Sequence, residues 1–197
     1  MATSVLDMSM SLDGYIAGPN DDIGNPGGDG FARLHEWLFT PDGSAFRTDD
    51  SPSGRLVARA WRAGAVITGR RTAEQVEHWG GDHNGMGVPV FVPSHRPPDP
   101  VVAGYPLINY VDGIESAMAQ AKAAAGERHV HVIGAYTGRR AIEAGVLDEL
   151  QIHVIPVLFG GGRRLFDVLP SRVELEVAEV LDTPEATHIR YRIPRLP

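Results

Sequence analysis

The sequence contains no cysteine, and this absence removes several kinds of chemistry. A chain without thiols forms no disulfides, binds no metal through thiolates and has no cysteine nucleophile. Basic residues are also scarce, with 18 Lys and Arg against 25 Asp and Glu and a formal net charge of −7. A general nucleic-acid binder needs a basic face to neutralise phosphates, so we expect no nucleic-acid partner. A local basic pocket for one phosphorylated ligand stays compatible with this charge.

Long apolar runs are missing as well. No window reaches the roughly 18 apolar residues that a membrane-spanning helix needs. The N-terminus has neither a basic start nor an apolar stretch of signal-peptide length. We therefore expect no membrane association and a cytoplasmic location. The length of 197 residues and a hydrophobic content of 43% predict one globular domain over residues 1–197.

Strand and helix patterns alternate along the chain. Apolar runs predict strands at 5–11, 65–67, 88–92, 107–111, 129–133 and 150–159. Helical spacing of apolar residues predicts helices at 31–39, 56–61, 114–125 and 136–144. Residues 173–180 and 187–193 alternate like an antiparallel hairpin. The sequence thus predicts an α/β fold with a mostly parallel central sheet, helices on both faces and an antiparallel C-terminal hairpin.

Three segments follow predicted strands, at the sheet edge where α/β folds bind ligands. The first segment consists of Thr68, Gly69, Arg70, Arg71 and Thr72. Free N–H groups at a helix start and two arginines suit a phosphate, although a helix with solvated arginines fits the pattern equally well.

The second segment consists of Ile133, Gly134, Ala135, Tyr136 and Thr137. Its small residues would let a pyrophosphate approach the backbone, but it is not the G-x-G-x-x-G fingerprint, and a plain turn fits as well.

The third segment, Ser94, His95 and Arg96, could hold a 2′-phosphate, although polar surface turns of this kind are more common.

Other patterns are weaker. Glu74 and His78 share a helical face, but the sequence from His78 to His83 is typical of an irregular loop, so we expect no metal site. The chain has no G-x-S-x-G nucleophile elbow.

Five motifs in order make a stronger pattern than any one of them. They are Ser11–Ala17, Gly69–Thr72, Ile133–Ala135, Asp148–Leu150 and Pro156–Phe166. Together they resemble the family that contains dihydrofolate reductase and the reductase domain of the bacterial riboflavin deaminase–reductase, most closely its stand-alone branch. The resemblance covers nearly the whole chain and implies a dihydrofolate reductase-like fold with NADPH as cofactor.

The resemblance also implies positions for the cofactor. Ser9 would present its backbone to the nicotinamide carboxamide, and Ile16 would pack on the ring. The adenosine phosphates would lie against Thr68, Gly69, Arg70, Arg71 and Thr72. The 2′-phosphate would meet Ser94 with His95 or Arg96, and the pyrophosphate would lie against Ile133, Gly134, Ala135, Tyr136 and Thr137.

The substrate side departs from the family pattern. Riboflavin-type reductases carry a glutamate that contacts substrate where this chain has Ile133, and aligning Trp37 with the first helix of dihydrofolate reductase puts Leu34 at the acid position. For the catalytic proton we rank Asp13 first and Glu36 second. Asp13 is equally explained as a turn residue that caps the Tyr15 N–H.

Trp37, Asp13, Arg163 and Arg164 are the expected substrate contacts, the arginines through a substrate phosphate. The implied reaction is hydride transfer from NADPH to a small heterocyclic or sugar-imine substrate, as in 5-amino-6-(5-phosphoribosylamino)uracil reductase. A dihydrofolate, pterin or other small-carbonyl reductase is the alternative, and a non-catalytic nucleotide-binding protein is the second. The resemblance and the apolar C-terminal strands also imply a homodimer.

Overall fold

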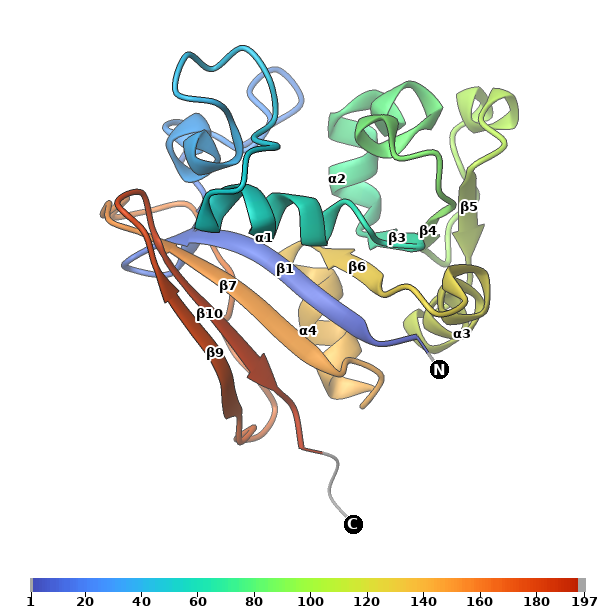
Figure 1. Ribbon diagram of the computed structural model, residues 1–197. Helices are drawn as coiled ribbons and strands as arrows, with labels where there is room; N and C mark the ends of the chain where they lie inside the picture. The colour runs from blue at the N-terminus through green and yellow to red at the C-terminus, as the bar shows by residue number, and fades with distance from the viewer. Residues whose placement is uncertain (1, 195–197) are drawn as a thin grey trace. The chain divides into compact units, whose positions relative to one another are not determined.

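The computed structural model describes residues 2–194, and their contacts gather into two compact units. Among the described residues, unit 1 contains 2–6 and Ala63–Glu149, and unit 2 contains Asp7–Arg62 and Leu150–Pro194. The strand β1 (Ser4–Ser11) contributes its first residues to unit 1 and its last to unit 2. Within the described residues, the strands of the main sheet follow the order β5-β4-β3-β6-β1-β7-β10-β9 (Figure 1).

Unit 1 is built on parallel strands. β3 (Ala65–Thr68), β4 (Val90–Pro93), β5 (Ile108–Val111) and β6 (Val130–Ile133) pair in parallel, and β6 also pairs in parallel with β1. Every residue of β3 is buried, which is why this strand reads as an unbroken apolar run rather than an alternation. Val66, Val90, Val92 and Ile108 form the centre of a buried cluster.

The helices of unit 1 follow its strands. They are α2 (Arg70–Gln75), α3 (Ile114–Ala125) and α4 (Ala135–Glu143), with short 3-10 turns at Glu77–Gly81, His83–Gly85 and Pro100–Gly104. The buried face of α3 repeats every three to four residues, through Ile114, Ala117, Met118, Ala121 and Ala125. The helix predicted over 114–125 is confirmed, and it ends at Gly126, whose φ of +64° favours glycine.

Unit 2 carries the antiparallel part of the fold. β9 (Glu176–Asp182) and β10 (Thr187–Arg192) form the hairpin predicted from sequence, and β2 (Tyr15–Ala17) pairs with the short β8 (Arg163–Arg164). β7 (Glu149–Ile155) ends four residues before the predicted Phe159. The reason is Pro156, which has no N–H to continue a ladder.

The predicted helix over 31–39 forms two 3-10 turns instead, η1 (Phe31–Leu34) and η2 (Glu36–Leu38). His35, with φ of −119° and ψ of −2°, ends the first turn and begins the second. The break lets Leu34 and Trp37 both enter a buried cluster with Leu56 and Val57 of α1 (Pro52–Ala60). Burial of these side chains therefore overrides the helical spacing.

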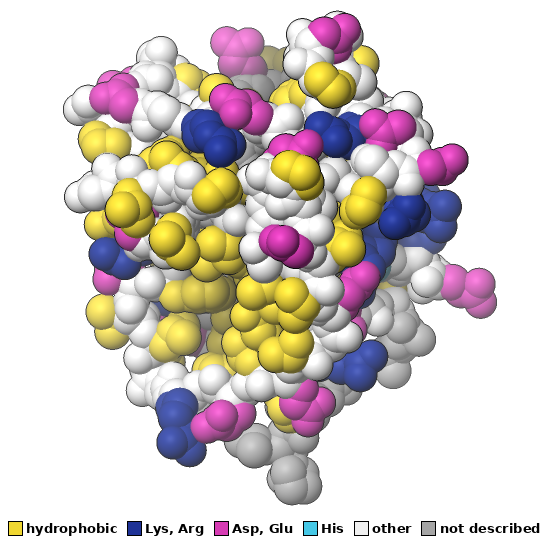
Figure 2. Space-filling model, turned by 60° about the vertical axis from the view of Figure 1, so that its left-hand side comes forward, with side chains coloured by type: hydrophobic (Ala, Val, Ile, Leu, Met, Phe, Trp, Pro, Cys, Tyr) yellow, Lys and Arg dark blue, Asp and Glu magenta, His cyan; other side chains and the backbone are white. Residues whose placement is uncertain are grey.

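β9 lies at the edge of the sheet and is exposed along most of its length. Val177 and Val180 on this strand are 63% and 59% exposed. In Figure 2 the left-hand side of Figure 1 is turned toward the viewer. Hydrophobic side chains gather on the face seen there. Among the described residues, no helix combines the length and apolar character needed to cross a membrane.

Candidate functional site

Two helices of unit 1 begin side by side at the ends of paired strands. Thr68 of β3 pairs with Ile133 of β6, so Gly69 and Gly134 follow at matching positions. These two glycines are the N-caps of α2 and α4, and neither receives a side-chain cap. The first N–H groups of a helix have no partner within it, and the helix dipole makes that end attractive to anions.

Threonine hydroxyls surround the same glycines. A Cβ on Gly69 would lie 2.9 Å from Thr137 Oγ1, and one on Gly134 would lie 3.7 Å from both Thr137 Oγ1 and Thr72 Oγ1. Gly134 has a φ of +98°, which side chains rarely adopt. Thr68 Oγ1 is buried without a hydrogen-bond partner among the described residues. Glycine cradles, hydroxyl donors and free N–H groups suit a pyrophosphate, so these residues fit the cofactor that the sequence implies.

Arg70 is already engaged by the protein. Its Nε bonds Glu74 at 2.5 Å, and its Nη1 reaches Ser94 Oγ and the carbonyls of Arg96 and Pro97 at 2.8–3.2 Å. The guanidinium also stacks on the Tyr110 ring. Arg70 therefore holds the segment after β4 against α2, and this structural role was not anticipated from the sequence.

The cations that face outward are Arg71 and Arg96, both exposed. Ser94 Oγ bonds the backbone of Arg96 within its own turn, and the exposed His95 contacts Asp112. Arg96 therefore presents positive charge at the end of β4, where the sequence places the 2′-phosphate.

The remaining residues of the α4 segment differ in exposure. Tyr136 is 67% exposed, with Arg139 over its ring. Ile133 packs against the core.

The three side chains considered as metal ligands have separate partners. Glu74 pairs with Arg70, His78 Nε2 bonds the Tyr110 hydroxyl at 2.9 Å, and His83 Nδ1 lies 3.3 Å from Met86 Sδ. The backbone at His78 and Trp79 is left-handed, in agreement with the irregular loop predicted there. Among the described residues, no group of three potential ligands converges.

In unit 2, the expected nicotinamide residues are buried. Ser9 is 5% exposed and its Oγ accepts a hydrogen bond from Trp37 Nε1 at 2.9 Å. Ile16 is 6% exposed and Trp37 only 3%. Trp37 therefore supports Ser9 from within the core rather than presenting a face to solvent.

Asp13 joins two loops of unit 2. Its carboxylate accepts hydrogen bonds from the Ser11 hydroxyl at 2.6 Å and from the N–H groups of Phe159 and Gly160 at 3.0 and 2.8 Å. The Ser11 hydrogen bond, with help from the two N–H groups, lowers the pKa of Asp13 to about 2. The expected cap on the Tyr15 N–H is wrong, because Ser11 Oγ fills it at 2.9 Å.

This geometry predicts the behaviour of Asp13→Asn. The Asn NH2 group cannot accept an N–H bond, so one of the Phe159 and Gly160 contacts should be lost. We expect faster hydrogen exchange at these two amides, with turnover reduced through loop disorder and NADPH affinity nearly unchanged. Turnover lost at unchanged amide protection would instead assign Asp13 to the chemistry.

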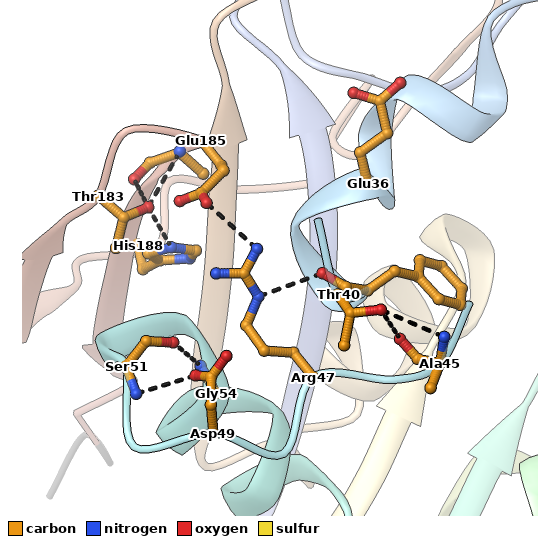
Figure 3. A network of polar contacts seen from close by, with 12 residues as sticks. Glu36, Thr40, Ala45, Arg47, Asp49, Ser51, Gly54, Thr183, Glu185 and His188 are labelled. Carbon is orange, nitrogen blue, oxygen red and sulfur yellow. Dashed lines mark hydrogen bonds and ion pairs between the residues drawn. The ribbon is translucent and has the colours of Figure 1, made fainter. Parts of the chain in front are cut away.

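The other substrate-side candidates lie at the surface. The Glu36 side chain is 63% exposed, pairs with Arg33 and points away from Arg47 and His188 in Figure 3. Arg163 pairs with Asp21 at 3.3 Å, while Arg164 bonds the Asp13 carbonyl and stacks on Tyr15. Both arginines keep exposed surface, so they can still meet a substrate phosphate.

Sequence reasoning missed a buried polar row in unit 2, made of Asp7, His153 and His188. His153 and His188 are each 1% exposed and lie on the neighbouring strands β7 and β10. The signal was partial, since His153 lies among apolar residues of β7 and Asp7 among apolar residues of β1, whereas His188 lies in the largely polar strand Thr187–Arg192. A single histidine in a strand is usually a satisfied core residue, and only the fold brings the three together.

The α/β sheet, with glycine-led helix starts beside one another, is an arrangement typical of α/β proteins that bind nucleotides. Comparison with known proteins identifies the family to which the chain belongs. The model of the RibD C-terminal domain matches residues 2–189. The chain belongs to this family, which is a family of reductases that use a nicotinamide cofactor, and it has the dihydrofolate reductase-like fold.

Solved structures agree with this family. A Shewanella sp. PV-4 protein, provisionally described as a riboflavin biosynthesis protein, is 27% identical, with a TM-score of 0.73 over 99% of this chain and 100% of its own. RibD of Acinetobacter baumannii is 15% identical, with a TM-score of 0.57 over 99% of this chain and 59% of its own.

The Thermotoga maritima diaminohydroxyphosphoribosylaminopyrimidine deaminase/5-amino-6-(5-phosphoribosylamino)uracil reductase is 13% identical, with a TM-score of 0.59 over 98% of this chain and 57% of its own. These last two likenesses concern the fold. No curated protein matches the chain at a significant level.

Proposed function

We propose that the protein is an NADPH-dependent reductase that transfers hydride to a small heterocyclic or sugar-imine substrate, in the manner of 5-amino-6-(5-phosphoribosylamino)uracil reductase. The observation that carries the proposal is the pair of uncapped, glycine-led helix starts in unit 1, with the Thr72 and Thr137 hydroxyls beside them. Membership of the RibD C-terminal family supports it.

The residues of this chain would bind and orient the reactants. The N–H groups at the start of α4 and the Thr137 hydroxyl would hold the pyrophosphate, and Ser9 with Ile16 would hold the nicotinamide. When bound, the nicotinamide supplies the hydride. Arg163 and Arg164 would attract a substrate phosphate, while Ile133 replaces the polar contact of the family glutamate with an apolar one.

NADPH oxidation with 5-amino-6-(5-phosphoribosylamino)uracil or dihydrofolate tests the proposal, and NADPH binding without turnover on either would favour a non-catalytic protein.

Cofactor choice follows from the charges after β4. A 2′-phosphate near Arg96 would gain a charge-assisted hydrogen bond, so NADPH should bind more tightly than NADH and added salt should shrink the difference. Arg96→Gln should weaken NADPH binding by roughly 10-fold or more and leave NADH binding unchanged, since such bonds contribute about 1.5–3 kcal/mol. Calorimetric titration at low and high salt measures this.

The matched control for Arg96→Gln is Arg172→Gln. Arg172 is an exposed arginine of unit 2 that pairs with Glu174. It should leave both affinities unchanged. Equal affinities of the wild-type protein for NADPH and NADH at low salt would contradict the proposed 2′-phosphate site.

We also propose a homodimer with a two-fold interface through the β9–β10 hairpin. Within residues 2–194, β9 is the last strand of the sheet, with no further strand beside it, and it exposes Val177 and Val180, a combination that favours pairing with another strand. Val180→Lys should convert the dimer to a monomer at micromolar concentration, as measured by light scattering. Val168→Lys is the control, because Val168 is 69% exposed outside the hairpin. A wild-type monomer would rule against the dimer.

A further inference from the structure

Arg70 lies at the centre of a network in unit 1 that fixes the turn after β4. Its Nη1 donates to Ser94 Oγ and to the carbonyls of Arg96 and Pro97, at 3.2, 3.0 and 2.8 Å. Ser94 Oγ also accepts a hydrogen bond from the Arg96 N–H at 3.2 Å and donates to the Arg96 carbonyl at 3.1 Å. The backbone of Arg96 is therefore held on both sides, while its side chain stays exposed.

Arg70 is itself held by two neighbours. Its Nε donates to Glu74, one turn further along α2, at 2.5 Å. Its Cζ lies 5.4 Å from the centre of the Tyr110 ring, which is within the range of a cation–π contact. Tyr110 lies on β5 opposite Val92 of β4, so its ring reaches Arg70 from the strand next to the turn. Only 17% of the Arg70 side chain is exposed, and these contacts leave it little freedom to move.

Tyr110 is held in turn by His78. The Nε2 atom of His78 lies 2.9 Å from the Tyr110 hydroxyl, and His78 is 2% exposed. Burial, with Glu74 nearby, raises the pKa of Tyr110, so the hydroxyl keeps its proton. Within residues 2–194, His78 Nδ1 is buried without a hydrogen-bond partner. The contact with Tyr110 therefore compensates in part for the burial of this imidazole.

The backbone around His78 is strained. Glu77, His78 and Trp79 have φ of 48°, 54° and 53°, so three consecutive residues with side chains are left-handed. Such a conformation is unfavourable for each L-residue and rarely occurs in a run. Strained backbone persists where the surrounding structure imposes it, and it is concentrated at functional sites. Here the strained run places a buried imidazole against Tyr110.

Core packing alone does not call for a charged side chain in this network. A guanidinium loses hydration when it is buried, and well-packed apolar side chains often stabilise a protein as much as a buried ion pair does. Arg70 supplies what an apolar side chain lacks, because its Nη1 bonds two successive carbonyls of the turn. The network therefore acts on the position of the turn that carries Arg96.

We propose that Arg70, supported by Tyr110 and His78, is a positioning residue that enables Arg96 to select the cofactor. This inference rests on the proposed function, which places the 2′-phosphate beside Arg96. A turn that is fixed before the cofactor arrives does not have to be ordered during binding, so less conformational entropy is lost. Nε and Nη1 of Arg70 are engaged within the protein, so Arg70 acts through Arg96 and does not contact the phosphate.

A double-mutant cycle tests whether Arg70 acts through Arg96. Arg70→Gln should weaken NADPH binding by roughly 3- to 10-fold, because the turn must then be ordered on binding, and should leave NADH binding unchanged. In an Arg96→Gln background the same substitution should not change NADPH affinity, since the phosphate contact is already lost. Losses that add in the double variant would show that Arg70 contacts the phosphate itself and would overturn the positioning role.

Tyr110→Phe tests the support from His78 with a smaller change. The variant keeps the ring against Arg70 and removes the hydroxyl that contacts His78. The ratio of NADPH affinity to NADH affinity should fall by roughly 2- to 3-fold, less than in Arg70→Gln, because the ring still stacks on the guanidinium. A general loss of folding would lower both affinities and leave their ratio unchanged.

The matched control for Tyr110→Phe is Tyr105→Phe. Tyr105 packs against the same cluster, and its ring lies 6.3 Å from that of His78. This variant should leave the affinity ratio unchanged. An equal fall of the ratio in both variants, or an unchanged ratio in Tyr110→Phe, would overturn the supporting role of Tyr110 and His78.

The network itself is tested without a cofactor. In ¹⁵N-arginine NMR spectra of the full chain, the Arg70 Nε–H, assigned by its loss in Arg70→Gln, should exchange slowly with solvent and faster in Tyr110→Phe. Exchange as fast as that of Arg172, whose side chain is 88% exposed, would overturn the network. Slow exchange in a protein that binds NADPH and NADH equally would instead contradict the proposed 2′-phosphate site and overturn the role of Arg70 in cofactor choice.

Discussion

Thr137→Val should weaken NADPH binding by roughly 10- to 100-fold. The substitution keeps the shape of this buried side chain and removes a hydroxyl that lies near both Gly69 and Gly134. A hydrogen bond to a charged group contributes about 1.5–3 kcal/mol, which corresponds to that range of affinity. Calorimetric or fluorescence titration measures the change. Gly134→Val should abolish binding, since a branched side chain would fill the space next to the backbone N–H groups.

The prediction for Thr137→Val needs a control variant, and the one for Gly134→Val needs a check of folding. Thr48→Val is the matched control, because Thr48 is exposed in unit 2 and should leave affinity unchanged. Gly134→Val also strains the backbone, because the φ of Gly134 is +98°. Circular dichroism must therefore show a folded variant before its loss of binding is interpreted. Normal NADPH affinity in folded Thr137→Val would place the pyrophosphate elsewhere.

Stability should fall steeply between pH 6.5 and pH 4. Burial and the neighbouring His153 lower the pKa of His188 from 6.5 to about 4, and burial lowers the pKa of His83 to about 3. As the pH falls below 6.5, the unfolded chain binds protons at these histidines before the folded chain does. At about 1.4 kcal/mol for each pH unit, His188 alone would cost roughly 3 kcal/mol by pH 4, a large share of a typical domain stability.

Urea unfolding at pH 7 and pH 5 measures this loss. His188→Gln and His83→Gln should each flatten the dependence of the unfolding free energy on pH, because they remove a group whose two states differ in proton affinity. An unfolding free energy that is the same at both pH values would contradict the buried, neutral state of these histidines.

Most strands and helices could be predicted because the local signals are strong. The run Ala65–Thr68 is apolar throughout, and the helix Ile114–Ala125 is alanine-rich and followed by a glycine. The segment from Phe31 to Phe39 has equally clear helical spacing, yet it forms two 3-10 turns because Leu34 and Trp37 are drawn into one core. Such packing depends on distant partners such as Ile155, which spacing alone does not reveal.

The parts of the candidate site that backbone positions determine could be predicted from the sequence. The parts that depend on contacts between distant side chains could not. Gly69 and Gly134 follow strands in the sequence, and a parallel pairing brings them together. The engagement of Arg70 by Ser94 and of Asp13 by Gly160 depends on residues 24 and 147 positions away. A separation of 146 residues likewise hid the contact between His153 and Asp7.

The most direct test of the central claim is a crystal structure with NADPH bound. We expect the pyrophosphate within hydrogen-bond distance of the N–H groups of Ala135 to Thr137 and of the Thr137 hydroxyl, with the 2′-phosphate beside Arg96. A pyrophosphate bound away from the start of α4, or a protein that binds no NADPH at millimolar concentration, would contradict the account.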